Sequence, residues 1–275
     1  MGATLIHDAA EIYHGTKALS NSSMGKLLKC PALFQQTLSE MDGDEHAETS
    51  AKLFGRVFHT MVLEPDKTAD EFAPKKNPGN TKAGKEEAAA AKEKGITLVS
   101  SDTWEVASAM AASANAHPLI VAAKRSPAWE TETSAYWQER DHIPCKARID
   151  AMATISGMPG LCVIDLKSTI DASPAGISKH ILDYGYHRQA AWYTHALGKC
   201  GRAANLFIFL FVEKTPPYLC TAVTIEEAAI QLAYDDIRNA LDTYERCEAN
   251  NEWPGYTTDI ITEIGLPEWA YRRAS

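Results

Sequence analysis

Residues 161–167 read LCVIDLK, an apolar run that carries an aspartate and a lysine two positions apart. The apolar and β-branched residues predict a buried strand. Side chains at i and i+2 of a strand point to the same face, so Asp165 and Lys167 should project together. Because burying either charge alone is costly, two interpretations remain: an ion pair at the end of a strand, or a catalytic site.

The segments around this run predict a sheet. Residues 133–140 (TSAYWQER) and 145–155 (CKARIDAMATI) are strand-like, and short turns separate them from each other and from residues 161–169. These three strands should form an antiparallel meander. Two further strands are predicted at 204–213 (ANLFIFLFVE) and 218–225 (YLCTAVTI), on either side of a KTPP turn.

The other segments follow the helical period. Ser22 or Ser23 should cap the first long helix, and Asp102 a later one. The predicted helices cover these ranges: 19–36, 51–65, 85–94, 100–120, 184–198 and 224–250. The organisation expected is one domain over residues 1–275, with a helical part at about 1–125, a catalytic sheet core at about 126–250 and a tail at 251–275.

The composition is that of an ordinary globular protein, with 45% hydrophobic and 23% charged residues among 275. A net charge of −9 does not indicate a nucleic-acid-binding protein, so any DNA-binding surface must be local. No apolar run reaches membrane-spanning length, and the first residues lack the pattern of a signal peptide. Six scattered cysteines without a C-x-x-C pair indicate reduced thiols. A cytoplasmic location is therefore expected.

A second acidic residue should lie beside the Asp-x-Lys strand. Asp150, in KARIDAM, precedes the turn that leads into that strand, so a hairpin can place it next to Asp165. Two carboxylates that close repel each other unless a cation lies between them. Oxygen ligands suit Mg²⁺ or Mn²⁺, and Lys167 could orient a water or stabilise charge on a phosphate. From these residues alone, a metal site and a structural ion pair are equally good readings.

The order of Asp150, VIDLK and QAAWY resembles the PD-(D/E)xK nuclease superfamily in its RecB-like branch. Over about residues 18–250 the chain looks most like the exonuclease VIII (RecE) type of nuclease domain. The resemblance implies an α/β restriction-endonuclease-like fold, in which helices flank a central mixed sheet behind a helical N-terminal region. It implies catalytic roles for Asp150, Asp165, Lys167, Gln189 and Tyr193. It implies metal binding by His59, Asp150, Asp165 and the backbone carbonyl of Leu166.

The resemblance also implies a function. The expected activity is a Mg²⁺-dependent deoxyribonuclease, with Mn²⁺ as a possible substitute, that degrades double-stranded DNA ends from 5′ to 3′. Such an exonuclease of phage or prophage recombination leaves a 3′ single strand for a RecT-like annealing protein and works as a homo-oligomeric ring. Two alternatives stay open: another RecB-like endonuclease or exonuclease, for example of the CRISPR-adaptation type, and a non-catalytic protein that binds DNA ends.

Several residues are left with two readings. Glu132 could help to bind metal or water, and an exposed strand charge is an equally good reading, whereas Glu64 should simply end a helix. The lysine-rich segment 75–94 is interpreted as a solvated face, with DNA contact by Lys75, Lys76, Lys82 and Lys85 as the alternative. Trp137 and Trp192 are expected in the core. Some relatives bind an iron–sulfur cluster through the cysteine matched by Cys30, but only Cys247 lies near the C-terminus, so no cluster is expected.

Overall fold

A computed structural model describes residues 2–40, 49–257 and 259–271. Six strands form the main sheet in the spatial order β1-β4-β5-β6-β7-β8. Their bounds are β1 (Thr4–Ile6), β4 (Glu130–Glu139), β5 (Ile143–Thr154), β6 (Leu161–Thr169), β7 (Leu206–Glu213) and β8 (Cys220–Val223). A second, two-stranded sheet pairs β2 (Phe72–Pro74) with β3 (Thr97–Val99).

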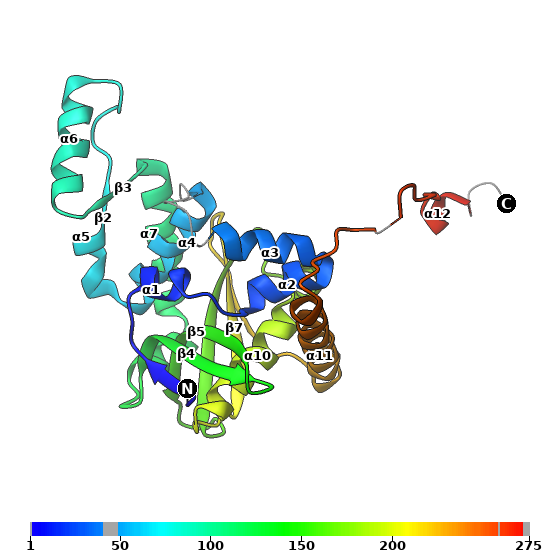
Figure 1. Ribbon diagram of the computed structural model, residues 1–275. Helices are drawn as coiled ribbons and strands as arrows, with labels where there is room; N and C mark the ends of the chain where they lie inside the picture. Colours follow the sequence, from blue (N-terminus) through cyan, green and yellow to red (C-terminus); the bar gives the residue numbers. More distant parts are fainter. Residues whose placement is uncertain (1, 41–48, 258, 272–275) are drawn as a thin grey trace.

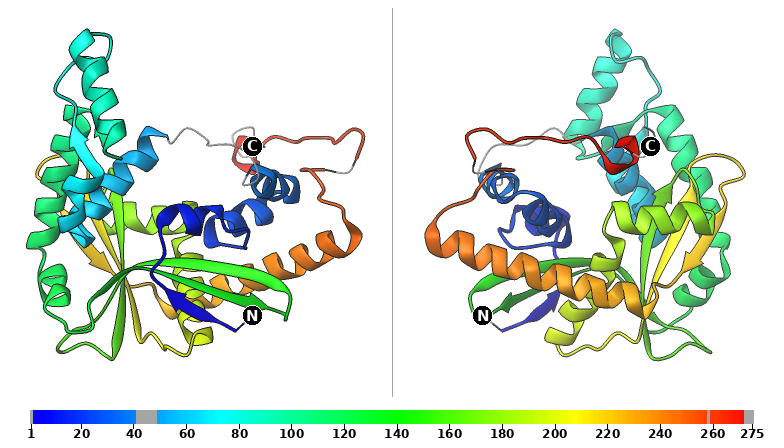
Figure 2. Two further views of the ribbon diagram at one scale, coloured as in Figure 1. Left: turned by 60° about the vertical axis from the view of Figure 1, so that its left-hand side comes forward. Right: turned by 90° about the vertical axis from the view of Figure 1, so that its right-hand side faces the viewer.

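The helices lie on both faces of the main sheet (Figures 1 and 2). Their bounds in the described residues are α1 (Ala10–Gly15), α2 (Asn21–Lys29), α3 (Pro31–Glu40), α4 (Ser50–Leu63), the 3₁₀ turn η1 (Pro65–Lys67), α5 (Thr68–Glu71), α6 (Lys82–Glu93), α7 (Ser101–Ala116), α8 (Pro118–Lys124), α9 (Pro174–Asp183), α10 (Tyr186–Lys199), α11 (Glu227–Asn250) and α12 (Glu268–Tyr271). The α/β class, a central mixed sheet with flanking helices, is confirmed.

The predicted meander is present. β4, β5 and β6 pair antiparallel in chain order, and β7 and β8 form the expected second hairpin. β6 and β7 run parallel, and the connection between them contains α9 and α10, as a parallel crossover requires. α10 therefore lies across the sheet beside the Asp-x-Lys strand, where its side chains can reach that strand.

The sheet separates two main hydrophobic layers. On one face, α4, α7 and α8 pack on apolar residues of β5, β6 and β7, among them Ile164 and Leu166. On the other face, α2, α3, α10 and α11 pack on β4, β5 and β6. Trp137 and Trp192 lie in this second layer, with ring centroids 4.7 Å apart, so their expected core position is confirmed. Apolar contact with α4 thus fixes that helix against the strands that carry the acidic residues.

The N-terminal part also contributes to the sheet. β1 adds an edge strand antiparallel to β4, with Thr4 opposite Tyr136. Lys146 helps to hold the segment that follows, because its Nζ donates hydrogen bonds to the carbonyls of Tyr13 (2.7 Å) and Thr16 (2.6 Å). A strand of three residues is too short to produce an alternating pattern, and for that reason the sequence predicted only helices here.

Both helix caps predicted for this part were wrong. The N-cap of α2 is Ser20, which forms a reciprocal capping box with Ser23, and Ser22 lies inside the helix. The N-cap of α7 is Ser100, whose side chain accepts a hydrogen bond from Thr103, two positions before the predicted Asp102. Both segments contain consecutive polar residues that could each cap a helix, so composition alone does not select the first one.

Among the described residues, no single helix has the length and apolar character needed to cross a membrane; α7 and α8 meet the criteria of length and composition only as a pair, which is bent by 75°. After α11, the described part of the tail runs away from the body and includes α12 (Figure 1). Residues 258 and 272–275 of the predicted tail lie outside the described residues.

Candidate active site

The pairing of β5 with β6 ends where the acidic residues lie. The ladder stops at the pair Ala151↔Ile164, and the next residue on each strand is Asp150 or Asp165. The Asp150 carboxylate then replaces a ladder contact, because its Oδ2 accepts a hydrogen bond of 2.8 Å from the backbone N–H of Leu166. The local geometry of the two strands therefore fixes Asp150 against the Asp-x-Lys strand.

Two side chains hold Asp165, which is only 1% exposed. Lys167 forms an ion pair with its Oδ1, and Gln189 of α10 donates a hydrogen bond of 2.5 Å to its Oδ2. The Lys167 ammonium also lies over the rings of Tyr186 and Phe209, 5.0 and 5.7 Å from their centroids. The predicted ion pair is thus present, and it lies inside the candidate active site rather than in place of one.

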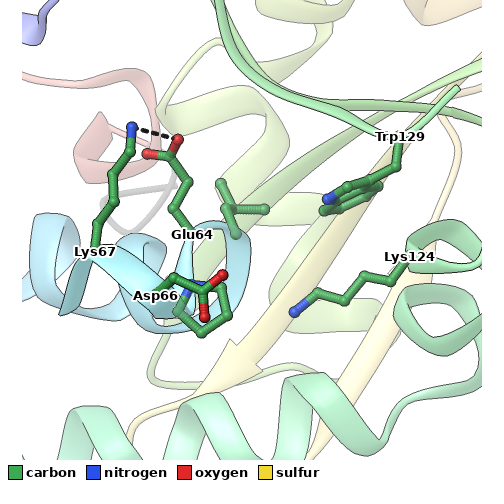
Figure 3. Close-up of a pocket in the computed structure, with 7 residues that line it drawn as sticks. Glu64, Asp66, Lys67, Lys124 and Trp129 are labelled. Carbon is green, nitrogen blue, oxygen red and sulfur yellow. Dashed lines mark hydrogen bonds and ion pairs between the residues drawn. The ribbon is translucent and has the colours of Figure 1, made fainter.

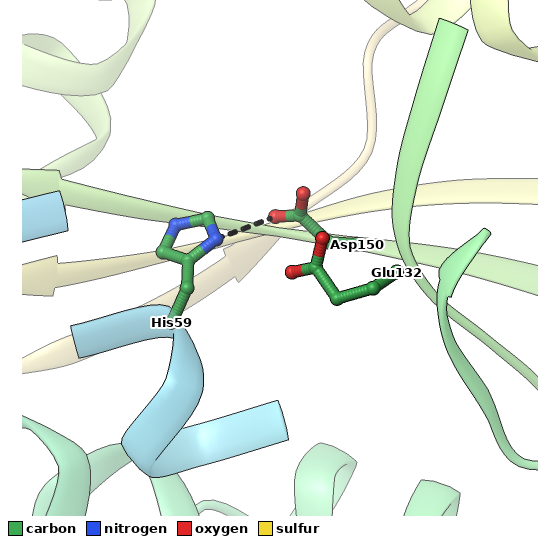
Figure 4. Close-up of side chains that lie close together, drawn as sticks. All are labelled: His59, Glu132 and Asp150. Carbon is green, nitrogen blue, oxygen red and sulfur yellow. Dashed lines mark ion pairs between the residues drawn. The ribbon is translucent and has the colours of Figure 1, made fainter. Parts of the chain in front are cut away.

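A possible metal-binding cluster lies next to this pair. His59 of α4, Glu132 of β4 and Asp150 of β5 each offer one ligand atom, and these atoms all lie within 4.8 Å of one another (Figure 4). The closest contact joins His59 Nδ1 to Asp150 Oδ2 at 3.4 Å. Three separate elements supply the three side chains, so the cluster depends on the packing of α4 against the sheet.

Burial sets the protonation of this cluster. It lowers the pKa of His59, which therefore has a neutral ring at pH 7. It raises the pKa of Glu132, and repulsion from Asp150 adds to the effect. Burial also raises the pKa of Asp150, against the attraction of Lys167. Both carboxylates thus lack sufficient positive charge nearby.

Arg148 supplies part of the missing charge. Its Nε donates a hydrogen bond of 2.7 Å to Glu132, and its Nη1 donates one of 3.1 Å to Asp8 Oδ1. Four acidic groups gather here, and three cations face them; the set comprises Asp8, Glu132, Asp150, Asp165, Lys146, Arg148 and Lys167. One negative charge is left without a partner when all four carboxylates are ionised, and a divalent cation would offset it.

The donor atoms fit such a cation. Carboxylate oxygens suit Mg²⁺ and Mn²⁺, and a neutral imidazole favours Mn²⁺ over Mg²⁺. The backbone of Leu166 hydrogen-bonds to His59, so its predicted ligand atom, the carbonyl oxygen, already faces the ring. Of the predicted side-chain ligands, His59 and Asp150 belong to the three-residue cluster, whereas Asp165 is engaged by Lys167. Glu132, whose role the sequence left open, is the third member.

Glu132 has an unusual backbone for a strand residue. Its φ is +50°, in a region that non-glycine residues rarely adopt. Its neighbours Thr131 and Thr133 pair with Ala151 and Ile149, so Glu132 stands at the register position opposite Asp150. Local strain of this kind is often kept at functional sites. The conformation brings the Glu132 carboxylate to both Asp150 and Arg148.

The structure places the predicted pair Gln189 and Tyr193 behind Asp165. Gln189 is buried and bonded to Asp165, whereas the partly buried Tyr193 packs edge-to-face on Phe207 at 6.1 Å. Burial raises the pKa of Tyr193 well above its usual value, and a hydrogen bond from Gln189 opposes the shift. In this arrangement Gln189 orients Asp165; the predicted contact of both residues with a substrate strand stays a prediction.

A separate pocket near the end of α4 is lined in part by charged side chains (Figure 3), three of which, Glu64, Lys67 and Lys124, have hydrogen-bond or ion-pair partners. Glu64 ends α4 and pairs with Lys67 at 2.7 Å, in agreement with its predicted structural role. Lys124 donates hydrogen bonds to the carbonyl of Val62 and to Asn115 Oδ1. These contacts connect the end of α4 to η1 and α8.

The stability of the metal-free protein should fall as the pH rises from about 4 to about 6. Burial raises the pKa of Asp165 from 3.8 to about 6, with Lys167 opposing the shift. In this range the folded protein keeps a proton that the unfolded chain has released, so unfolding becomes easier with rising pH, by up to about 3 kcal/mol. Urea unfolding in EDTA across this range measures the effect.

The Asp165→Asn variant should lose the part of this fall that Asp165 contributes, whereas Asp141→Asn, a matched change in the exposed turn of the β4–β5 hairpin, should keep all of it. Parallel pH profiles for the wild type and Asp165→Asn would show that Asp165 titrates normally and would contradict the prediction.

Replacing His59 by alanine should reduce the DNA cleavage expected from the sequence at low metal concentration. A high metal concentration should restore part of it. The reason is that one neutral ligand is lost while Glu132 and Asp150 remain. Activity titrated against Mn²⁺ and Mg²⁺ measures the shift, and His142→Ala, an exposed histidine near the hairpin turn, is the control. Equal metal dependence of wild type and His59→Ala would assign His59 a structural role only.

Comparison with known proteins identifies the family. Residues 20–262 match the family described as PDDEXK-like domain of unknown function (DUF3799). The chain belongs to this family. The match spans all the elements from α2 to α11 and includes every residue of the PDDEXK-like site described above, except Asp8. No curated protein matches the chain.

One similar solved structure is that of a putative exonuclease from Eubacterium rectale. It superposes with a TM-score of 0.60 over 95% of both chains, at 12% sequence identity. At this identity the similarity establishes the fold alone. The family match confirms the predicted membership of the PD-(D/E)xK superfamily, and the structural similarity agrees with its fold. The specific likeness to the RecE type stays a prediction.

Proposed function

We propose that this PDDEXK-like domain is a Mg²⁺- or Mn²⁺-dependent deoxyribonuclease that degrades double-stranded DNA from its ends. The observation that carries the proposal is the joining of two groups at one point: the ligand cluster His59–Glu132–Asp150 and the ion pair Asp165–Lys167. A purely structural ion pair would need no unbalanced carboxylates beside it. The acidic excess supports a role for a divalent cation.

Each residue has a distinct task in this proposal. The metal would be held by His59, Glu132 and Asp150. When bound, it would polarise the phosphodiester and lower the pKa of a coordinated water. Burial disfavours the charge on Lys167, but the attraction of Asp165 and Asp150 prevails and raises its pKa, so the ammonium stays protonated. With 17% of its side chain exposed, it can still reach a phosphate and stabilise the charge that develops there. Gln189 keeps Asp165 turned toward Lys167.

The finer features of the proposal rest on the resemblance in sequence. These are degradation from 5′ to 3′, a 3′ single strand handed to a RecT-like annealing protein, a ring of identical subunits, and a place in phage-type recombination. The exonuclease named among the similar structures agrees with an activity on DNA ends. None of these features follows from the geometry of the site.

The decisive experiment compares two DNA substrates in Mg²⁺, in Mn²⁺ and in EDTA. A linear duplex labelled at either the 5′ or the 3′ end and a covalently closed circle are incubated with the protein. Metal-dependent release of nucleotides from the linear duplex alone supports the proposal, and the label lost first gives the polarity. Cleavage of the circle would favour the endonuclease alternative. DNA binding without cleavage in either metal would favour the non-catalytic protein.

A further inference from the structure

An arm projects from the helical layer that carries His59. It comprises residues 72–99, in which β2 and β3 form the base and α6 the outer part, and all three views show it standing away from the body (Figures 1 and 2). The base is firmly rooted, because Phe72 and Val99 are buried in the layer formed with α4 and α7. The arm is therefore a rigid extension of the helices beside the candidate active site.

Hydrogen bonds and a close backbone contact hold the outer part of the arm together. The Glu87 carboxylate accepts hydrogen bonds from the backbone N–H groups of Lys76 and Asn77, both at 2.9 Å. Gly84 lies so close to the preceding loop that a Cβ there would be 2.1 Å from the carbonyl oxygen of Pro78. Three exposed alanines, residues 88–90, give α6 high helix propensity without a core to pack against. The helix thus holds its shape without covering any part of the hydrophobic layers.

The arm is positively charged in an acidic protein. Residues 75–94 contain six lysines and three glutamates, a net charge of +3, while the whole chain carries −9. All six lysines are exposed. One of the three glutamates, Glu87, is turned inward onto the loop, so it does less to offset the lysines at the surface. Positive charge is thus concentrated on the arm, although the molecule as a whole is acidic.

Three of these lysines form a stripe. Lys82, Lys85 and Lys92 are spaced three and seven residues apart, so they share one face of α6 over about 15 Å. The ion pair that Lys82 makes is weak, because its Nζ lies 3.8 Å from Glu86 Oε1 and both side chains are largely exposed. A straight row of flexible ammonium groups matches the regular phosphates of a duplex, which attract lysine without regard to base sequence.

We propose that the arm binds the phosphate backbone of duplex DNA beside the cleavage site and so raises the affinity of the protein for its substrate. The proposal rests on the proposed nuclease function for its ligand. It favours the alternative that the sequence left open for residues 75–94, which is contact with DNA, over a face that is merely solvated.

The test replaces Lys82, Lys85 and Lys92 by alanine, a change that preserves helix propensity. Binding of a fluorescent duplex is measured by anisotropy in EDTA from 50 to 200 mM salt. Loss of three phosphate contacts should reduce the salt slope, which is the slope of log affinity against log salt concentration, by about 2.7. Between 50 and 200 mM salt, the affinity of the wild type should therefore fall by a factor about 40 times larger than that of the variant. In the cleavage assay, KM for DNA should rise while kcat stays unchanged.

The control variant removes the same amount of charge elsewhere, through Lys29→Ala, Lys179→Ala and Arg246→Ala on α2, α9 and α11. It should lose clearly less of the salt slope than the arm variant. Equal slopes for the arm variant and the wild type, with cleavage intact, would overturn the arm proposal alone. An arm-dependent slope without cleavage in any metal would overturn the nuclease function and leave the arm as a DNA-binding element. Absence of DNA binding in the wild type would overturn the arm proposal and point to an acidic protein partner.

Discussion

Replacing Asp150 by asparagine is expected to reduce the rate of metal-dependent DNA cleavage by several orders of magnitude and to leave the fold intact. The amide oxygen can still accept the hydrogen bond from Leu166, but one negative ligand is lost. Burial and the neighbouring carboxylate of Glu132 disfavour the ionised form of Asp150. The metal-free variant, which carries no charge at this position, should therefore be as stable as the wild type or more so. Cleavage rate and melting temperature are measured on one preparation, with and without metal.

The melting temperature separates a direct role of Asp150 from an indirect one. Added Mn²⁺ should raise the melting temperature of the wild type and have little effect on Asp150→Asn, because a ligand that binds only the folded state stabilises it. Asp141→Asn, an identical change in the exposed turn of the same hairpin, should behave like the wild type. A folded Asp150→Asn variant that cleaves DNA at the wild-type rate would rule out the site.

Replacing Lys167 by methionine should both stop cleavage and destabilise the protein, by about 3–5 kcal/mol. Asp165 is 1% exposed, and without the ammonium it keeps only the hydrogen bond from Gln189 beside a second carboxylate. Urea unfolding at pH 7 measures the loss. The exposed Lys199→Met is the control, since its partner Glu139 keeps the hydrogen bonds from His195 and Trp137.

The double variant Asp165→Asn with Lys167→Met distinguishes packing from chemistry. It removes both charges, so most of the lost stability should return. Activity should not return, because no ammonium is left to meet the phosphate. If the double variant regains both stability and cleavage, the pair serves structure alone, and the proposed role of Lys167 is wrong.

Much of the sheet could be predicted because its four central strands are long enough to show their pattern. The apolar runs of β6 and β7 and the alternation in β4 and β5 extend over eight residues or more. β1 has three residues and pairs with a strand about 130 positions away, so nothing local identifies it. The misplaced caps have a related cause, since neighbouring serines have nearly equal local preferences and tertiary packing selects among them.

The site was predictable only in part, for similar reasons. Asp150 and Asp165 belong to one hairpin, so counting along the chain brings them together. Glu132 could have been found in the same way, because it lies seven residues before Glu139 and Asp150 lies seven after Ile143, and those two residues pair at the turn. The unusual φ of Glu132 has no signal in the sequence. His59 had no local signal and was named only through the family resemblance.

The scattered origin of the site has a consequence for the newly made chain. His59, Glu132 and Asp150 leave the ribosome before Asp165 and Lys167, and Gln189 follows only with α10. The pairing of β6 with its parallel neighbour β7 forms only after β7 has been synthesised. The pairing of β1 with β4 likewise requires a strand made about 130 residues later. Pairings between distant segments form late and slowly. A nascent or truncated chain that ends before β6 therefore has no Asp-x-Lys strand, and under the proposed function it would be unable to cleave DNA.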